Sequence, residues 1–119
     1  MSAPAADKVA YKIVDAGEWR AAVAEGRYEG APLDLADGFI HMSTETQTAE
    51  TVRRHFAGRD DLLLLTVDLG RFGDELVWEP SRGGDLFPHL YAPLPLAAVT
   101  ETRAFSTSAE GEMIFEDAA

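Results

Sequence analysis

The sequence contains no cysteine in its 119 residues. This excludes a disulfide scaffold, a thiol nucleophile and any cysteine-ligated zinc or iron–sulfur centre, and it is typical of a reducing compartment. The longest apolar run is four leucines at 62–65, far shorter than the roughly 20 residues that span a bilayer. The first ten residues lack the basic and apolar regions of a secretory signal. We therefore expect a cytoplasmic protein without a membrane span.

Basic residues are scarce. Lysine and arginine number 10 against 21 aspartates and glutamates, which gives a net charge of −11. Proteins that bind nucleic acid use lysine and arginine to neutralise phosphates, so a nucleic-acid partner is not expected. Acidic residues also gather in the last fourteen positions, without a base among them. This charge serves solubility or, as an alternative, attracts a basic protein partner.

The chain has the length of one domain, and its apolar pattern predicts two strand–helix units followed by several strands. Asp15 is the expected cap of the first helix and Gly26 its end. Thr44, followed three residues later by Gln47, resembles the capping box of a second helix. The expected strands are 9–14, 38–43, 61–69, 75–80, 86–91 and 97–105, and the expected helices are 17–25 and 45–57.

These elements indicate an α+β fold, with a twisted and largely antiparallel sheet and two helices packed on it. The continuous apolar stretch at 61–69 predicts a central strand that is buried on both faces. Residues 27–37 are expected to form a loop. Residues 1–8 are expected to be a flexible lead, 9–105 a single domain, and 106–119 an acidic, disordered tail.

A histidine interrupts an apolar strand at "GFIHMS", residues 38–43. Because side chains alternate along a strand, Phe39, His41 and Ser43 share one face, while Ile40 and Met42 belong to the core. Two readings remain for the hydroxyl of Ser43. It is either a nucleophile with a nearby base or part of the cap of the following helix.

The later segment "LFPHLY", residues 86–91, repeats this pattern, with Phe87, His89 and Tyr91 on one face. Its proline predicts an edge strand or a bulge. An aromatic wall with a few polar groups is typical of a small-molecule site. We therefore predict that His41 and His89 converge on one pocket, although each histidine could instead be a hydrogen-bonded structural residue.

Glu79, in "LVWEP", is the carboxylate predicted to assist the two histidines. It could orient an imidazole, act as a base, pair with Arg82, or simply lie at a strand end. His41, His89 and Glu79 are suitable metal ligands, but they occur singly, without H-x-H or H-x-x-x-H spacing. We therefore predict no metal site, and His55 is expected on the exposed side of its helix.

In this order, "GFIHMST", "LLLLTVD", "WEP" and "FPHLYAPLPL" resemble family 952 of the domains of unknown function, which are small bacterial domains of about this length. The resemblance runs from about residue 9 to residue 105. It implies a fold similar to that of ADP-ribosyltransferases, a split antiparallel sheet whose cleft holds NAD in the enzymes. By that analogy, His41, Ser43 and Thr44 line the cleft, with Tyr11 and Lys12 on the first strand opposite.

Two departures from those transferases are visible in the sequence. The late strand "FPHLY" carries no glutamate, and the first strand reads "YKI" in place of an arginine or H-G-S/T.

Three hypotheses about function follow. The first is an enzyme, a transferase or hydrolase, that acts on a nucleotide-like metabolite, with NAD or a relative as the cofactor that the resemblance implies. The second is a ligand-binding module without turnover, and the third is a protein-interaction module that uses the acidic surface.

Overall fold

The computed structural model describes residues 8–81 and 84–116. Helices and antiparallel strands make up the chain, which confirms the α+β class. The predicted flexible lead lies outside the described residues except for Lys8, whose backbone carbonyl accepts a hydrogen bond from the Leu69 N–H at 3.0 Å. Among the described residues, no helix has the length and apolar character needed to cross a membrane.

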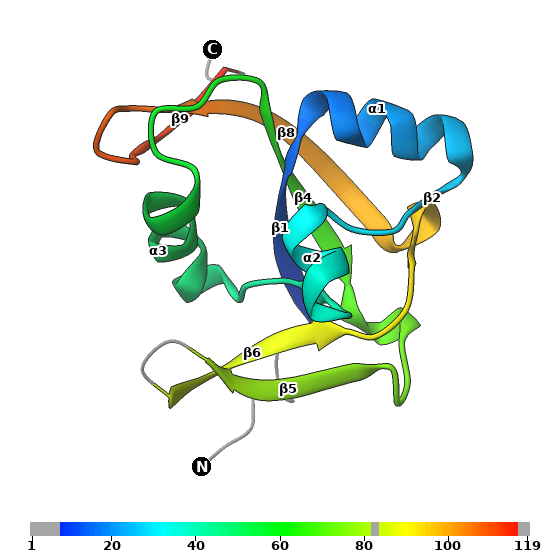
Figure 1. The fold of residues 1–119 in the computed structure, drawn as a ribbon. Helices are drawn as coiled ribbons and strands as arrows, with labels where there is room; N and C mark the ends of the chain where they lie inside the picture. The colour runs from blue at the N-terminus through cyan, green and yellow to red at the C-terminus, as the bar shows by residue number, and fades with distance from the viewer. Residues whose placement is uncertain (1–7, 82–83, 117–119) are drawn as a thin grey trace.

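The larger sheet has four strands in the order β1–β4–β8–β9, all paired antiparallel. Its strand β4 lies between β1 and β8, as the apolar run predicted. Leu62 and Leu64 face one core cluster, with Val52 of the second long helix, while Leu65 and Val67 face another. Figure 1 shows the helices α1 (Ala16–Glu25) and α3 (Glu45–His55) on opposite sides of this sheet. The strands are β1 (Val9–Asp15), β4 (Leu62–Asp68), β8 (Val99–Thr107) and β9 (Met113–Phe115).

The smaller sheet has three strands in the order β3–β6–β5, and β2 and β7 form a separate two-stranded pair. Four buried core residues from these strands, Tyr28, Ile40, Leu90 and Leu94, pack on the α1 side of the larger sheet. The strands are β3 (Ile40–His41), β5 (Leu76–Ser81), β6 (Asp85–Leu90), β2 (Arg27–Tyr28) and β7 (Leu94–Pro95), and two 3₁₀ turns are η2 (Leu69–Arg71) and η4 (Leu96–Ala98).

The prediction that "LFPHLY" is an edge strand or a bulge is wrong, because β6 is the middle strand of its sheet. The carbonyl of Pro88 accepts a hydrogen bond from the Met42 N–H at 3.1 Å. Pro88 has no N–H to return, so the β3–β6 ladder ends at the pair His41–His89. The proline therefore shortens the ladder on one side and leaves the pairing with β5 intact.

Both predicted helices are present. Asp15 caps α1 (Ala16–Glu25) by accepting from the N–H groups of Gly17 and Glu18, and the Gln47 side chain accepts from the Thr44 N–H at the start of α3 (Glu45–His55). A third helix, α2 (Pro32–Asp37), occupies the segment predicted to be a loop. It begins at Pro32, because the first N–H of a helix has no partner within the helix and its absence costs nothing. Gly30, Pro32 and Asp37 had instead indicated a loop.

The prediction of a disordered tail from residue 106 is wrong for the described residues. Strand β8 continues to Thr107, and β9 pairs with it. The chain returns because Phe115 packs on Phe105, with ring centroids 5.5 Å apart, and because Gly111 lies directly against α3. A Cβ atom at Gly111 would lie 2.7 Å from the Cα of Arg53. The high proportion of acidic residues concealed these apolar contacts.

Among the described residues, one backbone bridge joins the larger sheet to the segment that follows β3. The N–H of Tyr11 donates to the carbonyl of Ser43 at 2.7 Å, and the N–H of Ser43 donates to the carbonyl of Tyr11 at 2.9 Å. This isolated bridge joins the edge of β1 to the chain just after β3. Beyond this bridge, β1 and β3 separate, and the space between these two strands is part of the cavity described next.

Candidate functional site

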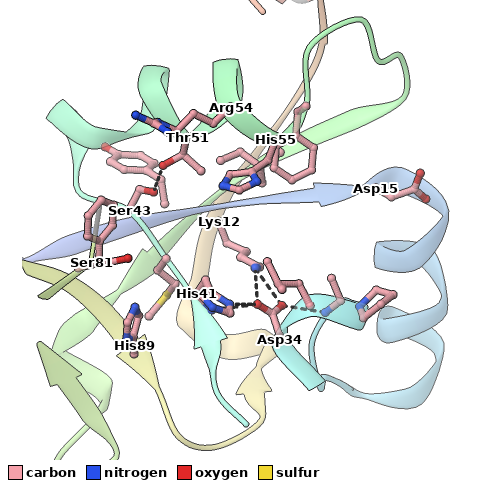
Figure 2. A pocket seen from close by; sticks show the side chains of 18 of the residues that line it. Lys12, Asp15, Asp34, His41, Ser43, Thr51, Arg54, His55, Ser81 and His89 are labelled. Atoms are coloured by element: carbon pink, nitrogen blue, oxygen red, sulfur yellow. Dashed lines mark hydrogen bonds and ion pairs between the residues drawn. The ribbon is translucent and has the colours of Figure 1, made fainter. Parts of the chain in front are cut away.

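A cavity of about 810 Å³ lies between β1, α2, β3, α3 and β6. All three histidines of the chain, His41, His55 and His89, line it. Figure 2 shows their side chains together with Lys12 and Asp34 at the lower part of the cavity and Ser43 and Thr51 at the upper part. The cavity therefore brings together segments that are far apart in the sequence.

The predicted site residues divide into two groups. Six of them line the cavity, namely Tyr11, Lys12, His41, Ser43, Phe87 and His89. The other four lie outside its lining, namely Phe39, Thr44, Glu79 and Tyr91. Thr44 is instead the residue that immediately precedes α3. Phe39 packs against both histidine rings, Glu79 contacts His89, and Tyr91 contacts Glu79 and Phe39.

His41 and His89 lie opposite each other on neighbouring strands. Their ring centroids are 5.5 Å apart and their planes are inclined by 69°. The strand pairing places both imidazoles on the same face of the three-stranded sheet. The geometric expectation that the two rings converge therefore agrees with the structure.

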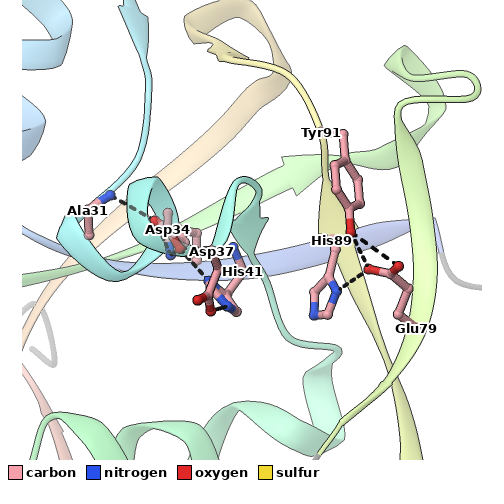
Figure 3. Close-up of polar contacts among 8 residues, drawn as sticks. Ala31, Asp34, Asp37, His41, Glu79, His89 and Tyr91 are labelled. Atoms are coloured by element: carbon pink, nitrogen blue, oxygen red, sulfur yellow. Dashed lines mark hydrogen bonds and ion pairs between the residues drawn. The ribbon is translucent and has the colours of Figure 1, made fainter.

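A carboxylate contacts each ring nitrogen of His41. Its Nδ1 lies 2.6 Å from Oδ1 of Asp34, and its Nε2 lies 2.9 Å from Oδ2 of Asp37. A neutral imidazole carries one N–H, so both contacts are hydrogen bonds only when both nitrogens are protonated. Both ring nitrogens of His41 therefore lie within hydrogen-bond distance of a carboxylate (Figure 3).

Asp34, at the start of α2, is the functional residue that the sequence analysis missed. It is 2% exposed and accepts hydrogen bonds from the N–H of Ala31 at 2.8 Å and the N–H of His41 at 3.0 Å. Burial alone would raise the pKa of Asp34, but the His41 ring and the Lys12 ammonium outweigh it and hold this pKa at about 2. One signal that could have identified Asp34 is its place as an acid at the third position of a helix that begins with proline.

Lys12 completes this buried cluster. Its Nζ lies 2.9 Å from Oδ2 and 3.1 Å from Oδ1 of Asp34. Burial lowers the pKa of Lys12, and Asp34 opposes that shift. Gly30 permits the close approach of the loop, because a Cβ there would lie 2.8 Å from the Cβ of Asp34. The ammonium group of Lys12 is thus paired with the Asp34 carboxylate.

His89 is 5% exposed, and its Nδ1 lies 2.7 Å from Oε1 of Glu79. The hydroxyl of Tyr91 donates to the same carboxylate at 2.9 Å. The hydrogen bonds from His89 and Tyr91 lower the pKa of Glu79, and the bond to Glu79 raises the pKa of Tyr91. Of the roles left open for Glu79, the structure has it orienting an imidazole. Arg82 lies outside the described residues.

Phe39 packs behind both imidazoles. Its ring stacks on His89, with centroids 4.1 Å apart and planes inclined by 24°. It also lies 4.6 Å from the ring of His41 and 5.0 Å from that of Tyr91. Phe39 therefore limits the movement of the histidine rings and does not itself line the cavity.

Helix α3 and the turn after it supply the opposite wall. The Oγ of Ser43 lies 2.8 Å from Oγ1 of Thr51, so the Ser43 hydroxyl contacts the side of α3 and does not cap it. Arg54, His55 and Arg59 also line this wall. His55 is exposed, as expected, yet its ring borders the cavity. Helical periodicity places Thr51, Arg54 and His55 on one side of α3 but cannot show what that side faces.

Two carboxylate–imidazole pairs therefore meet at one cavity. A carboxylate that holds one nitrogen of histidine fixes the ring and leaves the other nitrogen for proton transfer. This is the arrangement at His89, whereas carboxylates contact both ring nitrogens of His41. Among the described residues, no group of three or more acidic or histidine side chains is placed to hold a metal ion. The arrangement suits acid–base chemistry.

Comparisons with known proteins agree with this fold. The family model described as protein of unknown function (DUF952) matches residues 13–102. The crystal structure of protein CC0527 from Caulobacter crescentus is 47% identical with a TM-score of 0.84, covering 88% of this chain and 92% of that one. Its solution NMR structure has a TM-score of 0.77 at 47% identity, covering 87% and 90%.

No curated protein matches the chain. The family match covers most of the sequence and includes both histidine strands, so the resemblance noted from the sequence is confirmed. The chain belongs to the DUF952 family of proteins of unknown function.

Proposed function

We propose that the protein is an enzyme that acts on a small, nucleotide-like metabolite in the cavity between β1, α3 and the histidine strands. The observation that carries this proposal is the pair of carboxylate-held imidazoles, 5.5 Å apart, on one cavity wall. A structural histidine needs one partner, whereas two oriented rings at the same opening suit a transfer or hydrolysis reaction that moves protons.

His89 is the proposed general base. When its Nδ1 donates a proton to Glu79, the lone pair of Nε2 is free to accept one from water or from a substrate hydroxyl. Among the described residues, no hydrogen bond to this Nε2 is found, and the ring lines the cavity. His41, whose Nδ1 is held by Asp34, is the proposed second contact to the reacting group, through the Nε2 that Asp37 contacts in the structure.

The size and lining of the cavity support a nucleotide-like ligand. Its volume of about 810 Å³ lies within the range of about 300–1,000 Å³ that is usual for small-molecule sites. The rings of Tyr11 and Phe87 supply apolar surface for a base, and Arg54 and Arg59 supply charge for a phosphate. NAD or a relative is included because two antiparallel sheets joined at one bridge resemble the split sheet of ADP-ribosyltransferases.

Turnover of a defined panel tests the proposal. The protein is incubated with NAD, ADP-ribose, and nucleoside mono- and diphosphates, and products are identified by liquid chromatography and mass spectrometry. We expect product from at least one compound and a loss of roughly a hundredfold or more in His89→Gln. Glu101→Gln, an exposed change on β8, is the control and should leave turnover unchanged.

Two outcomes would overturn the enzymatic proposal. Equal turnover in His89→Gln would remove the histidine from the reaction. A rise in melting temperature with a compound that is never converted would assign the cavity to a binding module.

A further inference from the structure

The bridge between the two sheets defines which backbone groups face the cavity. Tyr11 and Ser43 exchange two hydrogen bonds, and backbone groups that face one neighbour recur at every second residue of a strand. The N–H and carbonyl of Ile13 therefore point to the same side as those of Tyr11. If the antiparallel pairing continued, the partner of Ile13 would be His41.

The pair Ile13–His41 does not form. Met42 directs its N–H to Pro88 of β6, so the N–H of His41, one residue earlier, points toward β1. That N–H donates instead to Oδ1 of Asp34 at 3.0 Å. The carboxylate thus takes the place that the carbonyl of Ile13 would occupy in a continuous sheet, and no backbone hydrogen bond of Ile13 toward β3 is found in the described ranges.

Asp34 is anchored from two sides. The Ala31 N–H holds it to the start of α2, and the Lys12 ammonium holds it to β1. The same carboxylate contacts Nδ1 of His41 at 2.6 Å. One buried side chain therefore fixes both the backbone and the ring of His41.

We propose that Asp34 is a positioning residue that holds β3 away from β1, keeps the cavity open at Ile13 and directs the His41 ring into it. The role of the ring in a reaction rests on the proposed function. The separation of the strands does not depend on that function and has its own measurement.

Amide hydrogen exchange followed by NMR tests the separation. In the wild-type protein, Lys12 and Val14 direct their N–H groups to β4, whereas Ile13 directs its N–H to the open cavity. We expect Ile13 to exchange at least roughly tenfold faster than both neighbours. The proposal is overturned if Ile13 exchanges as slowly as Lys12 and Val14 and a nuclear Overhauser contact joins the backbones of Ile13 and His41. This measurement needs only the wild-type protein.

The double variant Lys12→Met/Asp34→Leu removes the carboxylate together with its buried counter-charge. We expect the His41 N–H to pair with Ile13, so that exchange at Ile13 slows at least roughly tenfold and the backbone contact appears. Asp34→Asn is the matched variant, because its amide oxygen still accepts from the His41 N–H and the gap stays open. Unchanged exchange at Ile13 in a folded double variant overturns the proposal, and the result is independent of whether any compound is turned over.

Discussion

At the scale of single residues, the site depends on two carboxylates that reach their histidines in different ways. Glu79 lies ten residues from His89 and across the ladder between β5 and β6. Asp34 lies seven residues before His41, on a helix of six residues that buries its acid while Leu33 and Leu35 stay exposed. Each carboxylate fixes one imidazole. Removing the charge of Asp34 and removing the charge of Glu79 should have different, separately measurable effects.

Acid should remove the contribution of Asp34 to stability. Its pKa in the folded protein is about 2, below the value of about 3.9 for an unfolded chain. The contribution is therefore complete above about pH 4 and is lost as the pH falls toward 2. We expect about 2 kcal/mol from Asp34 alone, partly offset at neutral pH by the cost of burying Lys12.

Urea unfolding at pH 2.5 and pH 5 measures this contribution. The comparison is between the wild-type protein and Lys12→Met/Asp34→Leu, which keep their other carboxylates in common. The wild-type protein should lose more stability on acidification than the double variant. An equal loss in both would show that Asp34 is not the titrating group.

Glu79→Gln should shift the ionisation of Tyr91. The hydrogen bond to Glu79 raises the pKa of Tyr91, because removing the phenol proton would place a second negative charge beside the carboxylate. A neutral glutamine removes that repulsion, so the pKa of Tyr91 should fall. Tyrosine absorbance at 295 nm during an alkaline titration reports the change. Tyr91→Phe identifies the phenol, and Glu101→Gln should leave the titration as in the wild-type protein.

At the scale of elements, short segments complete the structure where sequence patterns were weak. Strand β9 has three residues and helix α2 has six, and neither has the length at which periodicity becomes informative. Both depend on close contacts with longer elements. Gly111 against α3 and Gly30 against Asp34 are the closest of these contacts.

Gly111→Ala should destabilise the protein more than Gly26→Ala. The two glycines have nearly the same backbone angle, with φ of 91° and 93°, so the strain of placing a side chain in that region is matched. A Cβ at Gly111 would meet the backbone of Arg53, whereas a Cβ at Gly26 meets no atom within 4 Å. We expect an additional loss of about 1–3 kcal/mol for Gly111→Ala.

Chemical denaturation of both variants gives the comparison. Equal losses would mean that the turn before β9 moves away from α3 at no cost. In that case the tail would be less firmly attached than its contacts indicate.

At the scale of the whole molecule, repulsion among the acidic residues and packing of the apolar core act against each other. A net charge of −11 on 119 residues favours expansion by repulsion among the acids. Two core clusters, one on each face of β4, hold the chain together. The Lys12–Asp34 pair is buried, so salt should affect it far less than it affects the surface.

Sodium chloride should therefore stabilise the protein at neutral pH. Raising the concentration from 0.01 to 0.2 M shortens the screening length from about 30 Å to below 10 Å and weakens the surface repulsion. The free energy of unfolding should rise by about 0.5–1 kcal/mol. Urea denaturation at both concentrations measures the change, and a decrease would mean that attractive surface pairs outweigh the repulsion.

The sequence predicted the features that depend on local pattern. The caps at Asp15 and Thr44, the central position of β4, and the shared faces of His41 and His89 follow from periodicity and short-range hydrogen bonding. The helix α2, the ordered tail and the central position of β6 did not follow. Their positions depend on contacts between residues far apart in the chain, such as Gly111 with Arg53 and Met42 with Pro88.

By itself, the sequence determined that this is a cysteine-free, acidic α+β chain with two histidine strands, because composition and side-chain alternation are local properties. The tertiary structure decided that both rings share one cavity and that the buried carboxylate of Asp34 accepts a hydrogen bond from the His41 N–H beside it. A buried carboxylate is stable only where distant groups supply its counter-charge and hydrogen bonds, and those groups come together only when the chain is folded.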